Sequence, residues 1–219
     1  MTYSDQVLKY VAGLVVPEME RLSFAQAAIK DEQDARLVEA NLGEYQQRLI
    51  PIVHQLRKFS GKSFPIEFER HYRRGVAKTG GAISLDFATL KKPLSELALT
   101  LAHEWGHQSM GHLTNNYCAH AAGIPIPEAE RQADYYGGIF LGVYGYDIEE
   151  LLKIKLSMPE TDPVHGTRFE RACMIMQGYQ HGQELQVGNS HPSLWPGFEL
   201  PWHDNSVKIQ ESNTRKLSK

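Results

Sequence analysis

The chain has 219 residues, of which 42% are hydrophobic and 22% are charged, and its formal net charge is −3. This length and composition suit one globular domain with a sizeable core and exclude a wholly disordered chain. Charges of both signs are mixed along the sequence, so neither nucleic acid nor an anionic membrane is expected as the main partner. We interpret the short basic run at residues 70–74 as a solvated loop or strand end.

Cysteine content and apolar stretches indicate the compartment. Cys118 and Cys173 are too few for a disulfide framework and have no Cys-x-x-Cys spacing. Residues 1–17 lack the basic start and the apolar core of a secretory signal. The uncharged stretch at 135–146 is too short to cross a bilayer, which needs roughly 20 apolar residues. We therefore expect a soluble, cytoplasmic protein, with two free thiols favoured over a single bridge between Cys118 and Cys173.

The N-terminal segment, residues 1–60, predicts helices that cover the core. Apolar side chains recur in it at steps of three and four residues, which is typical of one buried helix face. These residues are Val38, Leu42, Tyr45, Leu49, Ile52, Leu56 and Phe59. Pro51 lies within the stripe and is expected to kink or break the helix there.

Residues 61–187 predict the core domain, which begins with strands. Residues 64–69 alternate apolar and polar side chains, and residues 80–86 are a short apolar run opened by two glycines. Both patterns predict strands of a small mixed sheet.

Helices are predicted for the rest of the core domain. Pro93, Ser95 and Glu96 provide helix-start chemistry before an apolar pattern over residues 97–111. Further helices are expected over 128–141, 148–156 and 168–180. The sequence therefore predicts a mainly helical α+β domain. Residues 188–219 hold prolines among aromatic residues, without periodicity, and predict an extended C-terminal tail.

A metal site is predicted in the segment His103-Glu104-Trp105-Gly106-His107. Histidines four positions apart lie about 40° apart on one helix face, so both imidazoles can bind one ion. Imidazole suits Zn²⁺, and a catalytic zinc keeps three protein ligands and one open position. Glu104 lies beside His103 and can reach a metal-bound water without binding the metal, as a general base does.

The next predicted helix supplies the third ligand. Glu130 and Asp134 are four positions apart, and the small residues Ala133 and Gly137 beside them would let this helix approach the first one closely. We predict that Glu130 binds the metal and that Asp134 accepts the free ring N–H of a ligand histidine. A solvated helix face is the alternative for this acidic pair.

Two other groups of residues in or next to the predicted helix at 97–111 are expected to have structural roles. Leu97, Leu101 and Trp105 form a separate stripe that is expected to face the core. His112 falls on the Trp105 side by the same helix arithmetic, so we interpret it as a structural histidine distant from His103 and His107.

Together these motifs resemble the gluzincin peptidases, and in particular the group of HtpX-like and CAAX prenyl-protease-like enzymes, metallopeptidase family forty-eight. The matching segments are residues 97–107 with Gly111-His112, residues 130–134, and residues 81–85. The resemblance covers roughly residues 60–180 and implies a zincin-like fold and a single Zn²⁺ bound by His103, His107 and Glu130. Membrane-spanning segments found in several relatives are absent.

The resemblance also implies residues around the metal. The strand at Ala82, Ile83 and Ser84 would be a sheet edge that pairs with an extended substrate. A histidine followed six residues later by an arginine would stabilise the oxyanion, and His165 and Arg171 have that spacing. Family members usually have proline directly after this histidine, whereas Gly166 follows His165. The dipeptide His191-Pro192 is the alternative, but Gly197 lies six positions beyond it.

The sequence thus predicts a zinc metalloendopeptidase in which Glu104 moves the protons and His165, or a tyrosine such as Tyr135, helps to hold the oxyanion. Its partner would be a protein or peptide substrate. One alternative is a zinc-binding regulatory protein that does not turn over. Another is a latent peptidase inhibited by its tail, in which His191, Trp195, Trp202, His203 and Asp204 could reach the cleft. A zinc amidase or deacetylase acting on a non-protein substrate is also open.

Overall fold

The computed structural model describes residues 45–68, 75–113, 126–157, 161–162 and 166–187, and the single positions 36, 40 and 43. The predictions for most of the N-terminal segment and for the C-terminal tail lie outside the described residues. The predictions for the basic run at 70–74 and for His165 lie outside them as well.

The first described elements are the π-helical turn η1 (Tyr45–Leu49) and the helix α4 (Ile50–Ser60). Pro51 lies in the first turn of α4, where its missing N–H leaves no hydrogen bond unmade. The chain is helical on both sides of Pro51: the π-helical turn ends at Leu49 and the regular α-helix begins at Ile50. The helix therefore changes type beside Pro51 and is not broken there. Ile52, Leu56 and Phe59 of the apolar stripe are buried, which confirms the buried face of α4.

Three short strands form the main sheet: β1 (Ile66–Phe68), β2 (Gly75–Ala77) and β3 (Ile83–Leu85). Their order is β1-β3-β2, with β1 parallel and β2 antiparallel to β3. The sheet is therefore mixed, as predicted. β2 was not predicted, because a three-residue strand is too short to show an alternating pattern.

The prediction that residues 82–84 form a sheet edge is wrong. β3 is the central strand, and its three residues are all buried. The carbonyl of Ala82 already accepts hydrogen bonds from the N–H of Lys78 at 2.8 Å and from Nε2 of Gln108 at 2.9 Å. In the described part of the chain, β2 pairs with β3 alone, so β2 is the edge strand on this side.

The elements after the sheet are mainly helices. They are the 3₁₀ turn η2 (Phe87–Lys91), α5 (Leu94–Met110), α6 (Ile126–Tyr144), α7 (Ile148–Leu156) and α8 (Arg168–Val187). Between α7 and α8, the strands β4 (Thr161–Asp162) and β5 (Gly166–Thr167) pair antiparallel. The predicted bounds of α7 are confirmed, and Asp147 fixes its start by accepting the N–H of Glu149 at 2.9 Å.

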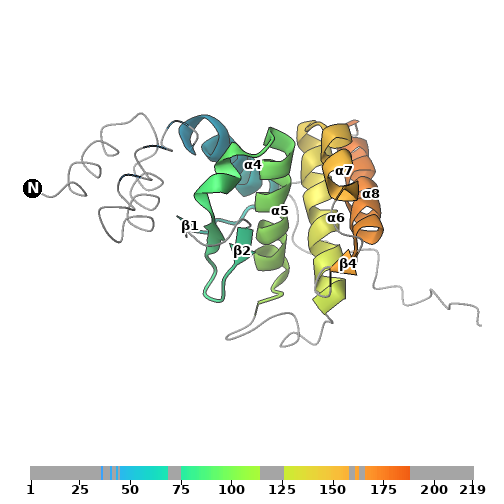
Figure 1. Cartoon of the computed structure of the whole chain (residues 1–219), viewed down its shortest axis with the longest axis horizontal. Helices are drawn as coiled ribbons and strands as arrows, with labels where there is room; N and C mark the ends of the chain where they lie inside the picture. Colours follow the sequence, from blue (N-terminus) through green and yellow to red (C-terminus); the bar gives the residue numbers. More distant parts are fainter. Residues whose placement is uncertain are drawn as a thin grey trace, which may run out of the picture.

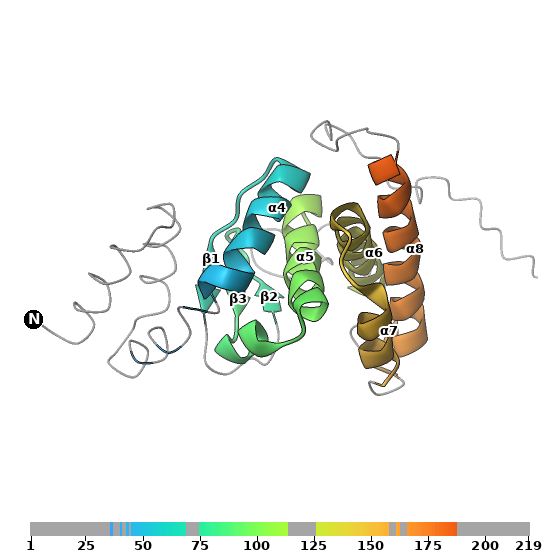
Figure 2. The same cartoon turned by 90° about the horizontal axis from the view of Figure 1, so that it is seen from above.

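The helices are arranged side by side, with α5 next to the sheet and α4, and α6 between α5 and α8 (Figures 1 and 2). Trp105 of α5 is fully buried, and its indole N–H donates to Oγ of Ser60 at 2.9 Å. Phe59 of α4 makes edge contacts with the rings of Tyr136 and Phe140 of α6. The core therefore joins α4, α5 and α6, and Trp105 faces it as predicted.

Glycines bring α6 and α8 into backbone contact. A Cβ atom added at Gly138 or Gly142 of α6 would lie 2.2 Å from a carbonyl oxygen of α8. Added at Gly178 or Gly182 of α8, it would lie 2.2 Å and 2.3 Å from carbonyl oxygens of α6. Only glycine permits this approach, so we call these four residues the glycine seam.

The described residues form mainly helices and one small mixed sheet, in agreement with the predicted α+β class. Of the helices in these residues, none combines the length and the apolar character needed to cross a bilayer.

Candidate metal centre

His103, Glu104 and His107 lie on the second half of α5. The exposed fractions of the two histidines are only 6% and 8%. The helix ends at Gly111, whose φ of 71° lies in the left-handed region that favours glycine. The predicted convergence of two imidazoles from one helix face is confirmed by the 3.1 Å that separates Nε2 of His103 from Nε2 of His107.

α6 brings Glu130 and Asp134 against this face of α5. Both carboxylates are buried. A Cβ atom added at Gly137 would lie 2.7 Å from Cδ1 of Leu99, which shows how closely α6 approaches α5 there. The predicted role of Gly137 in this approach is therefore confirmed, and the alternative of a solvated acidic face is wrong.

Three potential ligand atoms converge between the two helices. Nε2 of His103 is 3.1 Å from Oε2 of Glu130, and Nε2 of His107 is 3.5 Å from Oε1 of Glu130. Ligand atoms that lie about 2.0–2.1 Å from a tetrahedral zinc are about 3.3–3.4 Å apart. The buried group of His103, His107 and Glu130 therefore could hold a metal ion of this size.

The hydrogen-bond partners of His103 favour a cation between these side chains. Nδ1 of His103 faces Oδ1 of Asp134 at 2.9 Å, and since a carboxylate only accepts, the ring hydrogen lies on Nδ1. Nε2 of a neutral His103 would then point a lone pair at the Glu130 carboxylate. Without a metal ion, a proton fills this place: burial opposes it, but Asp134 and Glu130 outweigh burial and raise the pKa of His103 to about 10.

The carboxylates are charged for related reasons. Burial favours the neutral form of Glu130, but the hydrogen bond from His103 outweighs it and holds the pKa of Glu130 well below its ordinary value. Burial also opposes ionisation of Asp134, and hydrogen bonds from Arg171 and His103 outweigh it and lower the pKa of Asp134. Two ionised carboxylates thus lie beside the two imidazoles, and this set of donors is suited to a cation.

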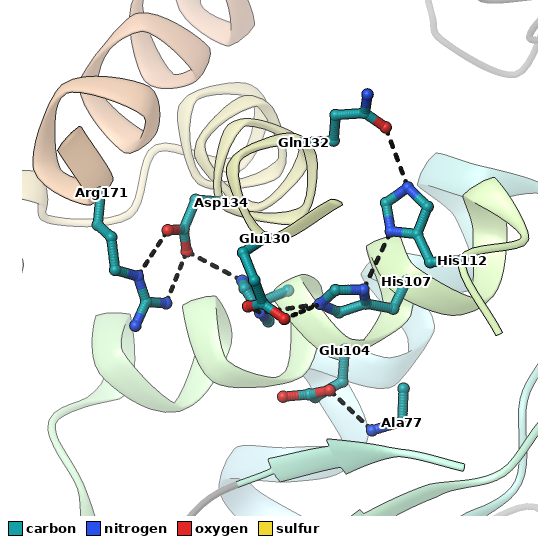
Figure 3. Close-up of polar contacts among 9 residues, drawn as sticks. Ala77, Glu104, His107, His112, Glu130, Gln132, Asp134 and Arg171 are labelled. Atoms are coloured by element: carbon teal, nitrogen blue, oxygen red, sulfur yellow. Dashed lines mark hydrogen bonds and ion pairs between the residues drawn. The ribbon is translucent and has the colours of Figure 1, made fainter. Parts of the chain in front are cut away.

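Asp134 connects the site to α8. Its carboxylate accepts Nδ1–H of His103, as predicted, and also binds Arg171, with Nε at 2.7 Å from Oδ2 and Nη2 at 2.9 Å from Oδ1 (Figure 3). The structure does not place Arg171 as an independent oxyanion residue. Its guanidinium is fixed on Asp134 because this carboxylate is its buried counter-charge.

Glu104 lies on α5, and its side chain reaches the edge strand β2. Its Oε2 accepts the backbone N–H of Ala77 at 2.7 Å (Figure 3). A Cβ atom added at Gly75 would lie 2.8 Å from Cγ of Glu104, so glycine makes room for this side chain under β2. Gly75 and Ala77 were not predicted as site residues, because nothing in the local sequence marks which strand lies at the edge.

The prediction that His112 lies away from the two histidines is wrong. Gly111 ends the helix, so helix arithmetic no longer applies to the next residue. The N–H of His112 donates to the carbonyl of His107 at 3.0 Å, and its Nδ1 lies 3.0 Å from Nδ1 of His107. The glycine that precedes His112 was the available signal for this reversal.

Tyr135 is not placed for the predicted oxyanion role. Its hydroxyl lies 2.9 Å from Nδ1 of His181, at the contact between α6 and α8. Tyr135 follows Asp134 directly, and a step of one residue turns the side chain by about 100° round the helix.

No protein-family model matches the chain, and searches of curated proteins and of solved structures gave no match either.

Proposed function

We propose that the chain is a zinc-dependent endopeptidase with a zincin-like arrangement of its metal helix and sheet. The observation that carries this proposal is the convergence of His103, His107 and Glu130, with Glu104 one residue after the first ligand. Two imidazoles and one carboxylate are the donors of catalytic zinc sites, in which a fourth position stays open. Bound zinc would polarise the scissile carbonyl and lower the pKa of a water molecule.

Glu104 is the proposed general base. It follows His103 on α5 and takes no part in the group of three ligand atoms. Its carboxylate would accept a proton from the attacking water and deliver it to the leaving amine. The hydrogen bond from Ala77 fixes one of its oxygens beside the edge strand, where an extended peptide would bind.

β2 replaces residues 82–84 as the proposed substrate-binding strand. Lys78 donates its N–H to Ala82 in the β2–β3 hairpin. Because outward and inward groups alternate along a strand, the N–H of Ala77 points away from β3. A substrate carbonyl could replace Glu104 as the acceptor of this N–H, which would release the carboxylate for the water. Pairing of this kind recognises the backbone of a peptide irrespective of most side chains.

His165 remains the residue that we predict to stabilise the oxyanion of the reaction. The described residue Gly166 follows it in β5, directly before α8, which carries Arg171. The His165–Arg171 pair implied by the family resemblance would therefore divide its roles: Arg171 fixes Asp134, while His165 would donate to the oxyanion.

Digestion of a mixed peptide library tests the proposal. We expect the zinc-loaded wild type to cleave peptides and Glu104→Gln to lose roughly 10³-fold or more of this activity, since the amide cannot accept the proton. Zinc content measured by mass spectrometry should be equal in the two proteins, because Glu104 is not a ligand. Equal cleavage by both would refute the role of Glu104. Absence of cleavage with zinc bound in both would favour the silent or latent alternatives.

A further inference from the structure

His112 has both ring nitrogens occupied by neighbours of the metal centre. Its exposed fraction is 1%. Nδ1 lies 3.0 Å from Nδ1 of His107, and Nε2 lies 3.0 Å from Oε1 of Gln132 (Figure 3). Gln132 lies on α6 between Glu130 and Asp134, so the contact ties the end of α5 to the helix that supplies the third ligand.

The orientation of the Gln132 amide is fixed from its other side. Its Nε2 donates to Oε1 of Glu128 at 3.2 Å, while Oε2 of Glu128 accepts from Arg131. An amide turned the other way would place its oxygen against the Glu128 carboxylate. Oε1 of Gln132 therefore faces His112 and can only accept a hydrogen bond.

The fixed acceptor Oε1 of Gln132 determines which ring nitrogen carries the hydrogen in His112 and then in His107. Nε2 of His112 has to donate to Gln132, and a neutral His112 then has an acceptor at Nδ1. Nδ1 of His107 donates to that acceptor, so Nε2 of His107 keeps its lone pair and faces His103 and Glu130.

We propose that His112 and Gln132 are positioning residues that hold His107 in the tautomer able to bind a metal through Nε2. This inference rests on the proposed metal centre and not on peptidase activity. Hydrogen-bonded partners of ligand histidines fix the ring orientation and the tautomer, and their loss typically weakens metal binding. Here the partner is a neutral imidazole backed by an amide, whereas His103 has the charged pair of Asp134 and Arg171.

A matched pair of substitutions at His112 tests the acceptor. The affinity for Zn²⁺ would be measured by competition with a chromophoric chelator in the wild type, His112→Gln and His112→Leu. Glutamine and leucine have similar size, but only glutamine offers an acceptor to Nδ1–H of His107. We expect His112→Leu to bind zinc roughly 10–100-fold more weakly than the wild type and His112→Gln to regain most of this loss. Equal affinities of the two variants would overturn the proposal.

Nitrogen NMR of the zinc-loaded protein tests the tautomers directly. Long-range ¹H–¹⁵N spectra should show His112 neutral with its proton on Nε2, and His107 with its proton on Nδ1. In Gln132→Leu the acceptor is gone, and His112 should populate both tautomers. Gln177→Leu, at an exposed position of α8, is the matched control and should keep the wild-type pattern. A proton on Nδ1 of His112 in the wild type would overturn the proposal.

The two proposals fail in different ways. A wild type that binds no zinc would refute the metal centre and this inference together. Zinc binding with the expected tautomers but without peptide cleavage would refute only the peptidase. Zinc binding with peptide cleavage and the opposite His112 tautomer would refute only the proton order.

Discussion

The face of α6 that packs on α5 and the face that packs on α8 are built from different residues. The first carries the buried carboxylates Glu130 and Asp134, and its polar contacts include hydrogen bonds with His103 of α5. The second carries Gly138 and Gly142, and its closest contacts are backbone against backbone. The face toward α5 thus carries the ionisable side chains of the site, whereas the face toward α8 carries glycines that let the two backbones touch.

The comparison shows that the metal ligands on the α5 side depend on the packing of α6 against α8, although the glycines of that packing take no part in binding a metal. Arg171 reaches Asp134 from α8, and Asp134 in turn holds Nδ1–H of His103. The close approach along the glycine seam fixes the distance between α6 and α8. A substitution that moves α8 away from α6 should therefore disturb the metal ligand His103 through Arg171 and Asp134.

Removing Asp134 should have the largest effect, because it acts on both faces. Asp134→Ala leaves the guanidinium of Arg171 and Nδ1–H of His103 without their buried acceptor. Loss of one partner from a buried ion pair costs about 3–5 kcal/mol of unfolding free energy, and we expect zinc affinity to fall roughly 10–100-fold. Urea denaturation and chelator competition would measure the two effects. Unchanged zinc affinity would show that His103 needs no partner.

A methyl group in the glycine seam should have the next largest effect. Gly138→Ala places a Cβ atom 2.2 Å from the carbonyl oxygen of Ile175, and backbone cannot rotate away. We expect a loss of about 3 kcal/mol in unfolding free energy, although alanine gains about 1 kcal/mol in helix propensity.

The adjacent glycine provides the control for that substitution. In Gly137→Ala the one short contact of the new Cβ atom is with the terminal methyl group of Leu99, at 2.7 Å, and this group can rotate; the nearest backbone atom lies at 3.7 Å, an ordinary contact distance. Urea denaturation should show a loss at position 137 that is smaller by at least about 1 kcal/mol. Equal losses at the two positions would contradict the distinction between the two faces of α6.

Cutting the link between α8 and the site should have the smallest effect. Arg171→Met keeps the length of the side chain and removes its hydrogen bonds to Asp134, while His103 still donates to this carboxylate. We expect a loss of about 2 kcal/mol in unfolding free energy and a decrease in zinc affinity of roughly tenfold or less. A decrease as large as that of Asp134→Ala would mean that Arg171 acts on the metal site by another route.

The part of the site that sequence could predict is the part encoded by helical spacing. His103 and His107 are four positions apart, and so are Glu130 and Asp134, so each pair shares a face whatever the tertiary fold. That Asp134 would accept a ring N–H of a ligand histidine was also predictable, because carboxylates commonly accept the free N–H of ligand histidines.

The remaining features depend on where the chain turns or pairs over long range. Gly111 reverses the chain after α5, so His112 returns to His107 instead of continuing along the helix. The sheet order places β2 at the edge, and no local pattern distinguishes it from β3. The four-residue spacing of the glycines in both α6 and α8 was a visible signal of the glycine seam, but its meaning requires that the two helices be neighbours.

The position of bound zinc tests the central claim most directly. Anomalous X-ray scattering at the zinc edge, from crystals of protein loaded with one equivalent of Zn²⁺, would locate the ion without reference to activity. We expect one peak about 2.0–2.2 Å from Nε2 of His103, Nε2 of His107 and a carboxylate oxygen of Glu130, with Glu104 outside bonding distance. A peak at another place, or none between these three side chains, would contradict the metal centre.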